Sequence, residues 1–123
     1  MATVLLIEDG AAVRRIYSTA LKRAGHDVLE AEGGDAGLKL ATAQHPDAIV
    51  LDLVMPDLSG WDVIRRLRAD AATADIPVQA ISAESHESID GDDAYLLGCD
   101  RFLKKPIKLG VLVGEVAELV RPH

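Results

Sequence analysis

Five short apolar runs recur along this chain, and helical patterns occupy most of the stretches between them. The runs cover residues 3–7, 27–31, 47–51, 77–81 and 101–104. They are nearly continuous in apolar residues, which is typical of strands covered on both faces. Repeated strand–helix units of this kind predict an α/β fold with a parallel sheet. Right-handed crossovers then favour a doubly wound, flavodoxin-like sheet of five strands in the order 2-1-3-4-5, with five helices.

Helical spacing is clear in most of the connecting stretches. In the first one, the apolar positions follow one helix face and predict a buried core stripe; they are Val13, Ile16, Tyr17, Ala20, Leu21 and Ala24. The fourth connection is different, because residues 84–93 are almost all polar and include Gly91, which weakens a helix interior. We expect a long mobile loop there and a helix that begins only near residues 90–93. The other helical patterns lie at 35–44, 60–70 and 112–120.

Length and charge limit what such a fold can do. A chain of 123 residues predicts one domain, spanning 1–123, with a core of ordinary size. Its 13 basic and 20 acidic residues give a net charge of −7, which argues against direct binding to nucleic acid or to anionic membranes. The single cysteine, Cys99, excludes an internal disulfide and suits a reducing compartment. With no leader pattern and no apolar run long enough to span a bilayer, we expect a cytoplasmic protein.

Reactive polar side chains stand where four of the five predicted strands end. Glu8 and Asp9 follow the first run, Asp52 the third, Ser82 the fourth and Lys105 the fifth. The carboxyl ends of parallel strands meet at one edge of the sheet, and ligands bind there in open α/β folds. We therefore expect these side chains to form one site.

Three carboxylates in a small volume point to a divalent cation. Glu8, Asp9 and Asp52 would repel one another unless one is protonated or a cation lies between them. Mg²⁺, or Mn²⁺ in its place, suits hard oxygen ligands and keeps waters that a phosphate oxygen can replace. Any one of these acids alone would be a solvent-exposed strand cap. Asp52 is also a candidate nucleophile, because a carboxylate can carry a phosphoryl group as an acyl phosphate.

A D-x-x-M-P-x-x-x-G string begins at Asp52, after the early acidic pair and before a late Lys105–Pro106 dipeptide. This combination resembles the receiver domain of two-component response regulators, and the resemblance covers nearly the whole chain. It implies a CheY-like fold in which Asp52 takes a phosphoryl group from a sensor histidine kinase or a histidine-phosphotransfer protein. Lys105 would neutralise charge on that group. The resemblance also implies that the backbone carbonyl of Val54 is a metal ligand and that the Lys105–Pro106 bond is cis, although few X–Pro bonds are.

The same resemblance assigns switch and lifetime roles around the acceptor. Ser82 would bind a phosphoryl oxygen and move together with Phe102, the aromatic that swings inward in receivers. Val54 and Glu84 would flank the path of the hydrolytic water. Because the Val54 side chain cannot hold a water, we expect a long-lived acyl phosphate. The partner face would lie on the fourth helix, the fifth strand and the fifth helix.

Three other interpretations fit the residues less well. A flavodoxin-type FMN binder carries a phosphate loop rich in Gly, Ser and Thr after its first strand, where this chain has Glu8 and Asp9. A phosphatase that works through an aspartyl phosphate needs a second acid two residues after the nucleophile, where this chain has Val54. A receiver-like module that no longer takes up phosphate would have lost site residues that are all present here.

The resemblance describes a signalling phosphoacceptor and not an enzyme. Because this chain contains no effector domain, we expect a stand-alone regulator that acts on a protein partner by direct contact. A phosphorelay shuttle, or a receiver cut from a larger regulator, is the alternative.

Overall fold

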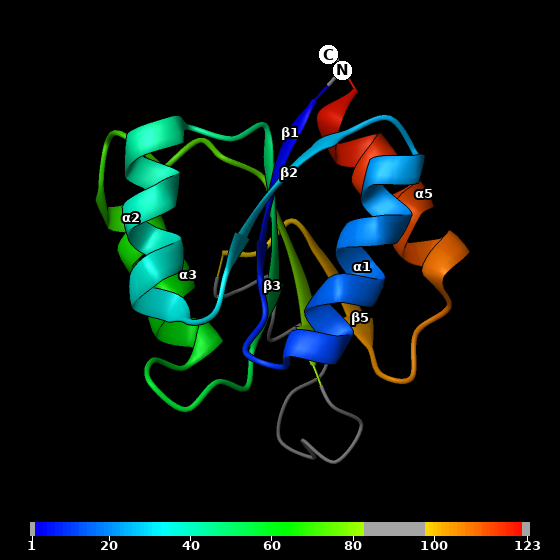
Figure 1. The fold of residues 1–123 in the computed structure, drawn as a ribbon. Helices are drawn as coiled ribbons and strands as arrows, with labels where there is room; N and C mark the ends of the chain where they lie inside the picture. The colour runs from blue at the N-terminus through cyan, green and yellow to red at the C-terminus, as the bar shows by residue number, and fades with distance from the viewer. Residues whose placement is uncertain (1, 83–97, 122–123) are drawn as a thin grey trace.

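The computed structural model describes residues 2–82 and 98–121 and contains one five-stranded parallel sheet (Figure 1). Its strands lie in the order β2-β1-β3-β4-β5, so the predicted doubly wound order is confirmed. All four strand pairs are parallel. The strands are β1 (Thr3–Ile7), β2 (Asp27–Ala31), β3 (Ala48–Asp52), β4 (Val78–Ser82) and β5 (Arg101–Lys104).

Four helices lie in the described part of the chain, each at a stretch where the sequence predicts one. The predicted fourth helix and the loop before it fall within residues 83–97, outside the described residues. The helices are α1 (Ala11–Arg23), α2 (Gly34–Gln44), α3 (Gly60–Ala69) and α5 (Leu109–Val120).

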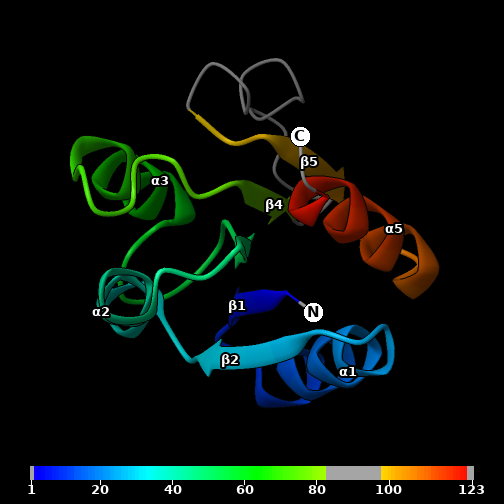
Figure 2. The same ribbon diagram turned by 90° about the horizontal axis from the view of Figure 1, so that it is seen from above.

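Helices cover the sheet on both faces, which explains the continuous apolar runs. α2 and α3 lie on one face, and α1 and α5 lie on the other (Figure 1 and Figure 2). In β1, Leu5 and Ile7 belong to the core cluster under α2 and α3, whereas Val4 and Leu6 belong to the cluster under α1 and α5. Because side chains alternate along a strand, β1 is buried on both of its faces.

Part of the predicted core stripe of α1 is wrong. Ile16 is 51% exposed and Ala24 is exposed as well, whereas Tyr17 and Leu21 are buried. The core-facing stripe centres on those two buried residues, so Ile16 lies on its flank, in a surface groove that Leu109 of α5 also lines. A helical pattern places Ile16 beside the core face but does not tell where that face ends.

The chain after β5 contains the Lys105–Pro106 peptide bond, which is cis, so this prediction is confirmed. Among the residues that the structure describes, no helix has the length and apolar character needed to cross a bilayer.

Candidate functional site

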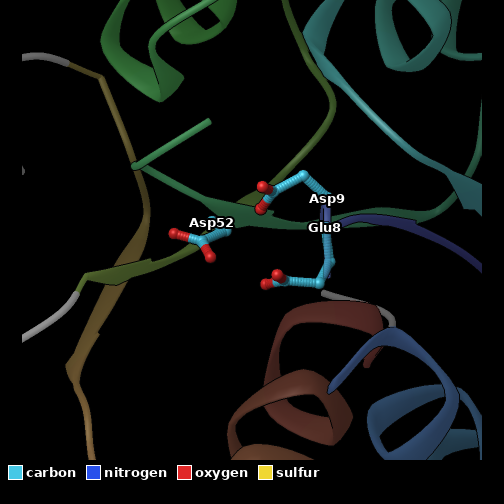
Figure 3. Close-up of side chains that lie close together, drawn as sticks. All are labelled: Glu8, Asp9 and Asp52. Carbon is cyan, nitrogen blue, oxygen red and sulfur yellow. The ribbon is translucent and has the colours of Figure 1, made fainter. Parts of the chain in front are cut away.

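Three carboxylates meet at the carboxyl end of the sheet (Figure 3). Glu8 and Asp9 directly follow β1, and Asp52 is the last residue of β3, the strand that pairs with β1. One oxygen atom from each of the three carboxylates lies within 4.8 Å of the other two. The fold therefore brings together three acids that are up to 44 residues apart in the sequence (from position 8 to position 52).

Asp52 is buried, with 5% of its surface exposed, and both of its carboxylate oxygens accept hydrogen bonds. Nζ of Lys105 donates to Oδ2 over 3.1 Å, and the backbone N–H of Val54 donates to Oδ1 over 2.9 Å. A carboxylate is costly to bury without such partners. These two donors compensate for the water that Asp52 has lost.

Glu8 is buried as well, and its surroundings favour the protonated form. Burial, followed by the hydrogen bond with Asp52, raises the pKa of Glu8 to about 7, against the opposing effect of the Gly10 backbone N–H. That N–H donates to Oε1 of Glu8 over 3.0 Å, and Nζ of Lys105 lies 3.9 Å from Oε2. Without a further cation, Glu8 therefore carries only part of a negative charge near neutral pH.

Lys105 places its ammonium group among these acids. Burial lowers the pKa of Lys105, but the hydrogen bond with Asp52 and the charges of Asp52 and Glu8 raise it above its ordinary value overall. The backbone N–H of Lys105 donates to the carbonyl of Ser82 over 2.7 Å, which fixes the residue against the end of β4. One ammonium group cannot fully neutralise three carboxylates, so the site attracts a further cation.

The donor set fits a hard divalent cation such as Mg²⁺. The cluster consists of carboxylates alone, and oxygen is the ligand that Mg²⁺ prefers. Glu8 and Asp52 are buried, whereas Asp9 is exposed, so the cluster faces solvent on the side of Asp9. A cation that retains several waters suits a site that is half protein and half solvent.

The other predicted site residues surround this cluster. Ser82 is buried at the end of β4, the strand next to β3. Phe102 lies on β5 and is partly buried against the core cluster under α2 and α3. Val54 comes two residues after β3, and 43% of its surface is exposed. Glu84 lies outside the described residues.

Two further side chains shape this end of the sheet and were not predicted. Arg14 of α1 donates to the backbone carbonyl of Glu8 over 2.9 Å and pairs with Glu30 over 3.3 Å. Asp57, in the loop after β3, accepts hydrogen bonds from the first backbone N–H groups of α2. The sequence offers only a weak signal for the first contact, namely an arginine soon after an acidic strand end. It offers none for the second, because the partners are distant in the chain.

Comparison with known proteins finds a family match over most of the chain. The response regulator receiver domain family matches residues 4–117. Over 123 residues the chain is 42% identical to the KDP operon transcriptional regulatory protein KdpE of Escherichia coli, covering 100% of this chain and 53% of that protein. Over 107 residues it is 35% identical to protein PilH of Pseudomonas aeruginosa, covering 87% of this chain and 88% of that protein.

The match to solved structures extends over the same region. The receiver domain of the Francisella response regulator 1452 superposes with a TM-score of 0.89 at 27% identity, covering 98% of this chain and 97% of that one. In sequence, this chain spans about half the length of KdpE and of two other related transcriptional regulators.

Proposed function

The chain belongs to the response regulator receiver domain family, and we propose that within this family it is a phosphoacceptor switch with Asp52 as the acceptor. Two-component signalling, phosphorylation and Mg²⁺ are typical of the family. The observation that carries the proposal is the buried Asp52 carboxylate, which is bonded to Lys105 over 3.1 Å and lies beside the acidic pair Glu8 and Asp9. Asp52 is thus a potential nucleophile with the ammonium group of Lys105 beside it and a potential metal site next to it.

The proposed transfer moves one phosphoryl group from a phosphohistidine donor to Asp52. A carboxylate oxygen of Asp52 forms a bond to phosphorus while the phosphorus–nitrogen bond of the donor breaks. The donor imidazole leaves with the bonding electron pair and takes up a proton. Lys105, which lies next to the acceptor oxygen Oδ2, can then pair with the oxygens of the transferred group.

Glu8, Asp9 and Asp52 would hold Mg²⁺ or Mn²⁺, together with the backbone carbonyl of Val54. When bound, the cation neutralises charge on the phosphoryl oxygens. The chain's own contribution is to keep the acids within 4.8 Å of one another and to leave Asp9 accessible from solvent. We assign the direct ligands to Asp9 and Asp52, with Glu8 acting partly through water.

The signal would leave the site through Ser82 and Phe102. Ser82 ends β4 beside the acceptor strand, and Phe102 lies on the neighbouring strand β5, so a movement of the first can reach the second across one strand pair. The output is then contact between another protein domain and the face formed by the predicted fourth helix, β5 and α5. We propose a signalling role for this domain and not turnover of a substrate. The donor is a sensor histidine kinase or a histidine-phosphotransfer protein.

Magnesium titration tests the metal part of the proposal. Trp61 at the start of α3 is the one tryptophan in the chain, so its fluorescence reports on a single position. The signal should saturate with Mg²⁺ in wild type, and Asp9→Ala should weaken binding several-fold because an oxygen ligand is lost. Asp70→Ala, which alters an acid in the loop after α3, should bind as wild type does. An affinity that Asp9→Ala leaves unchanged would refute the metal assignment.

Uptake of phosphate from acetyl phosphate tests the role of Lys105. Lys105→Ala should lower the initial rate by roughly 10-fold or more, because a fixed charge at the transferring group is lost. Lys104→Ala is the matched control, since Lys104 is exposed and should leave the rate unchanged. Equal rates for the two variants would remove Lys105 from the proposed mechanism.

A further inference from the structure

A carboxylate in the middle of the β3–α3 loop is bonded to a different helix. Gly34 N–H donates to Oδ1 of Asp57 over 3.1 Å, and Asp35 N–H donates to Oδ2 over 3.2 Å. The first N–H groups of a helix have no acceptor within that helix. The N-cap residue of α2 is Gly33, which offers no side-chain cap. Asp57 therefore caps α2 from a loop that lies more than twenty residues further along the chain.

The end of α2 is shaped to receive this loop closely. A Cβ atom on Gly33 would lie 2.8 Å from both carboxylate oxygens of Asp57, and one on Gly34 would lie 2.7 Å from Cβ of Leu58. Such contacts are too short for real Cβ atoms, so a methyl group at Gly33 would displace the Asp57 carboxylate, and one at Gly34 would push against Leu58. The N–H of Asp35, and then that of Gly34, also hold the pKa of Asp57 below its ordinary value.

The same loop carries Val54, and its two ends are fixed by other bonds. At its start, the backbone N–H of Val54 donates to Oδ1 of Asp52 over 2.9 Å. At its end, the N–H of Gly60 donates to the carbonyl of Leu53 over 3.0 Å. Asp57 lies between these two points, so its bonds to α2 limit how far the segment after Val54 can move away from the strand end.

We propose that Asp57 is a positioning residue that clamps the β3–α3 loop to α2 and thereby holds the backbone of Val54 against Asp52. We call this pair of bonds the Asp57 clamp. The inference rests on the proposed function, in which Val54 supplies a carbonyl ligand and Asp52 supplies the acceptor oxygen. Asp57 acts on both through the loop, because its own carboxylate is bonded to α2.

Amide hydrogen exchange at Val54 tests the clamp without phosphate, and Mg²⁺ titration tests its consequence for the site. Asp57→Ala should accelerate exchange of the Val54 amide several-fold and weaken Mg²⁺ binding several-fold. Asp57→Asn keeps one carbonyl oxygen as an acceptor and should lie between wild type and Asp57→Ala. Asp70→Ala is the matched control, because its carboxylate also accepts a backbone bond, from Ala72 N over 2.9 Å, but in the loop after α3. It should match wild type in both measurements.

Gly33→Ala disturbs the clamp from the opposite side. Gly33 has a φ of −165°, extended backbone that alanine also adopts, so the effect comes from the methyl group displacing the Asp57 carboxylate. Gly33→Ala should reproduce the two effects of Asp57→Ala, and the double variant should be no worse than either single one, since both remove the same bonds. Losses that add in the double variant would contradict a shared clamp.

Wild-type exchange at Val54 together with wild-type Mg²⁺ affinity in folded Asp57→Ala would overturn the inference. Should that variant fail to fold, Asp57→Asn and Gly33→Ala decide the matter by the same two measurements. Uptake from acetyl phosphate separates this inference from the proposed function. A wild type that takes up no phosphate would reject the proposed function, while exchange at Val54 would still show whether Asp57 positions the loop.

Discussion

Asp52 and Glu8 are buried, and the half-buried Lys105 places one ammonium group beside both carboxylates. Nζ of Lys105 lies 3.1 Å from Asp52 and 3.9 Å from Glu8, and Asp9 adds a third acid on the solvent side. A phosphoryl group on Asp52 would bring further negative charge. Lys105 and a divalent cation can neutralise that charge, which bulk water would otherwise have to do. The proposed phosphoryl transfer would therefore depend on fixed charges of the site that compensate one another.

Val54→Asn should shorten the lifetime of the acyl phosphate several-fold or more. Val54 is apolar and 43% exposed, two residues after the proposed acceptor Asp52, where it would shield phosphorus from water. An asparagine there can orient the attacking water instead. The measurement is the decay of phosphorylated protein after the donor has been removed. Val54→Ala serves as the control that removes bulk without adding a polar group. If Val54→Asn loses phosphate no faster than wild type, position 54 does not control access of water.

Cys99 should resist alkylation in the native protein at pH 8. Burial, and next the charge of Asp100, raise the pKa of the Cys99 thiol to about 11, so the reactive thiolate is scarce at that pH. Iodoacetamide followed by mass spectrometry should show slow labelling of native protein and rapid labelling in urea. Labelling at the same rate in both conditions would mean that the thiol is accessible in the folded state.

The positions of the reactive residues were predictable because each one ends or follows an apolar run. For Glu8 and Asp52, the rule that parallel strands end at one edge of a sheet was enough. The choice of Lys105 over its neighbour Lys104 came from the resemblance to receiver domains. The hydrogen bonds between individual atoms were not predictable. The hydrogen bonds between Asp57 and α2 depend on how closely the β3–α3 loop approaches that helix. The exposure of Ile16 depends on how much of the surface of α1 is covered by α5.

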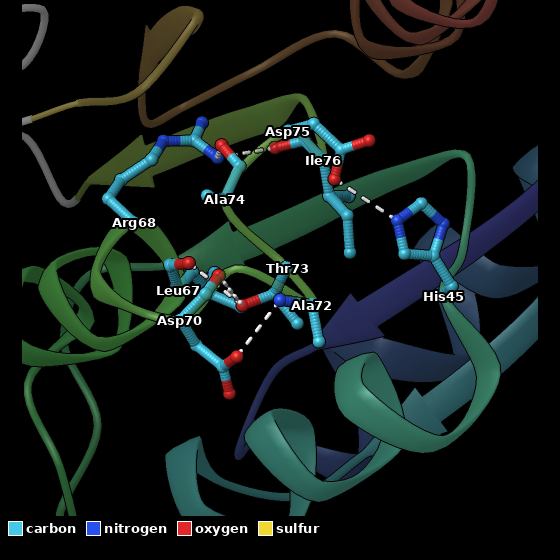
Figure 4. A network of polar contacts seen from close by, with 9 residues as sticks. All are labelled: His45, Leu67, Arg68, Asp70, Ala72, Thr73, Ala74, Asp75 and Ile76. Carbon is cyan, nitrogen blue, oxygen red and sulfur yellow. Dashed lines mark hydrogen bonds and ion pairs between the residues drawn. The ribbon is translucent and has the colours of Figure 1, made fainter.

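Arg68 of α3 forms hydrogen bonds with the segments that precede β4 and β5. Its guanidinium donates to the carbonyls of Gly98, Ala74 and Ile76 and pairs with Asp100 over 2.9 Å. Figure 4 shows Arg68 beside the α3–β4 loop. In this loop the N–H of Ala72 donates to the Asp70 carboxylate, and the Thr73 hydroxyl donates to the carbonyl of Leu67 in α3. All three carbonyls belong to residues outside the helices and strands, so Arg68 supplies donors to backbone groups there. Arg68 therefore links α3 to the segments that lead into β4 and β5.

Arg68→Ala should destabilise the protein by about 2 kcal/mol, because several carbonyl bonds to a charged donor are lost at once. Arg65→Ala is the matched control on the same helix. Arg65 is exposed and pairs with Asp62 three residues earlier, so its loss should cost less than about 1 kcal/mol. Urea denaturation of the three proteins measures both values. Equal losses would show that the Arg68 bonds add little to stability.

Strands were predicted more accurately than helix surfaces. Three of the predicted runs match β1, β2 and β5 at both ends, and the other two are displaced by one residue. The displaced strands are β3 and β4, which begin one residue later than predicted and end on the polar residues Asp52 and Ser82. Helix α1 is buried on one stripe only, and a stripe has flanks that the sequence does not separate from its centre.

The molecule as a whole places its polar chemistry at one edge of a sheet whose two faces are packed against helices. The core clusters under α2 and α3 and under α1 and α5 are separate, and the sheet lies between them. A change at the strand ends can therefore pass along the sheet to β5 and, through the cluster under α1 and α5, to α5. Phosphorylation would then shift an existing equilibrium of this fold.

Hydrogen exchange with Mg²⁺ and beryllofluoride, a phosphoryl mimic, tests this direction of signalling. Protection should change in β5 and α5, because the proposed switch residues Ser82 and Phe102 lie on β4 and β5. Asp52→Asn treated in the same way provides the control for effects of the reagent alone. Changes confined to α2 would contradict the proposed switch.

Intact-mass spectrometry after incubation with acetyl phosphate and Mg²⁺ asks directly whether Asp52 accepts a phosphoryl group. Wild type should gain the mass of one phosphoryl group and should gain none when EDTA removes the metal. Asp52→Asn, nearly the same in shape but without a nucleophilic carboxylate, should gain none under either condition. An equal gain in folded Asp52→Asn, or no gain in folded wild type, would contradict the assignment of Asp52 as the phosphoacceptor.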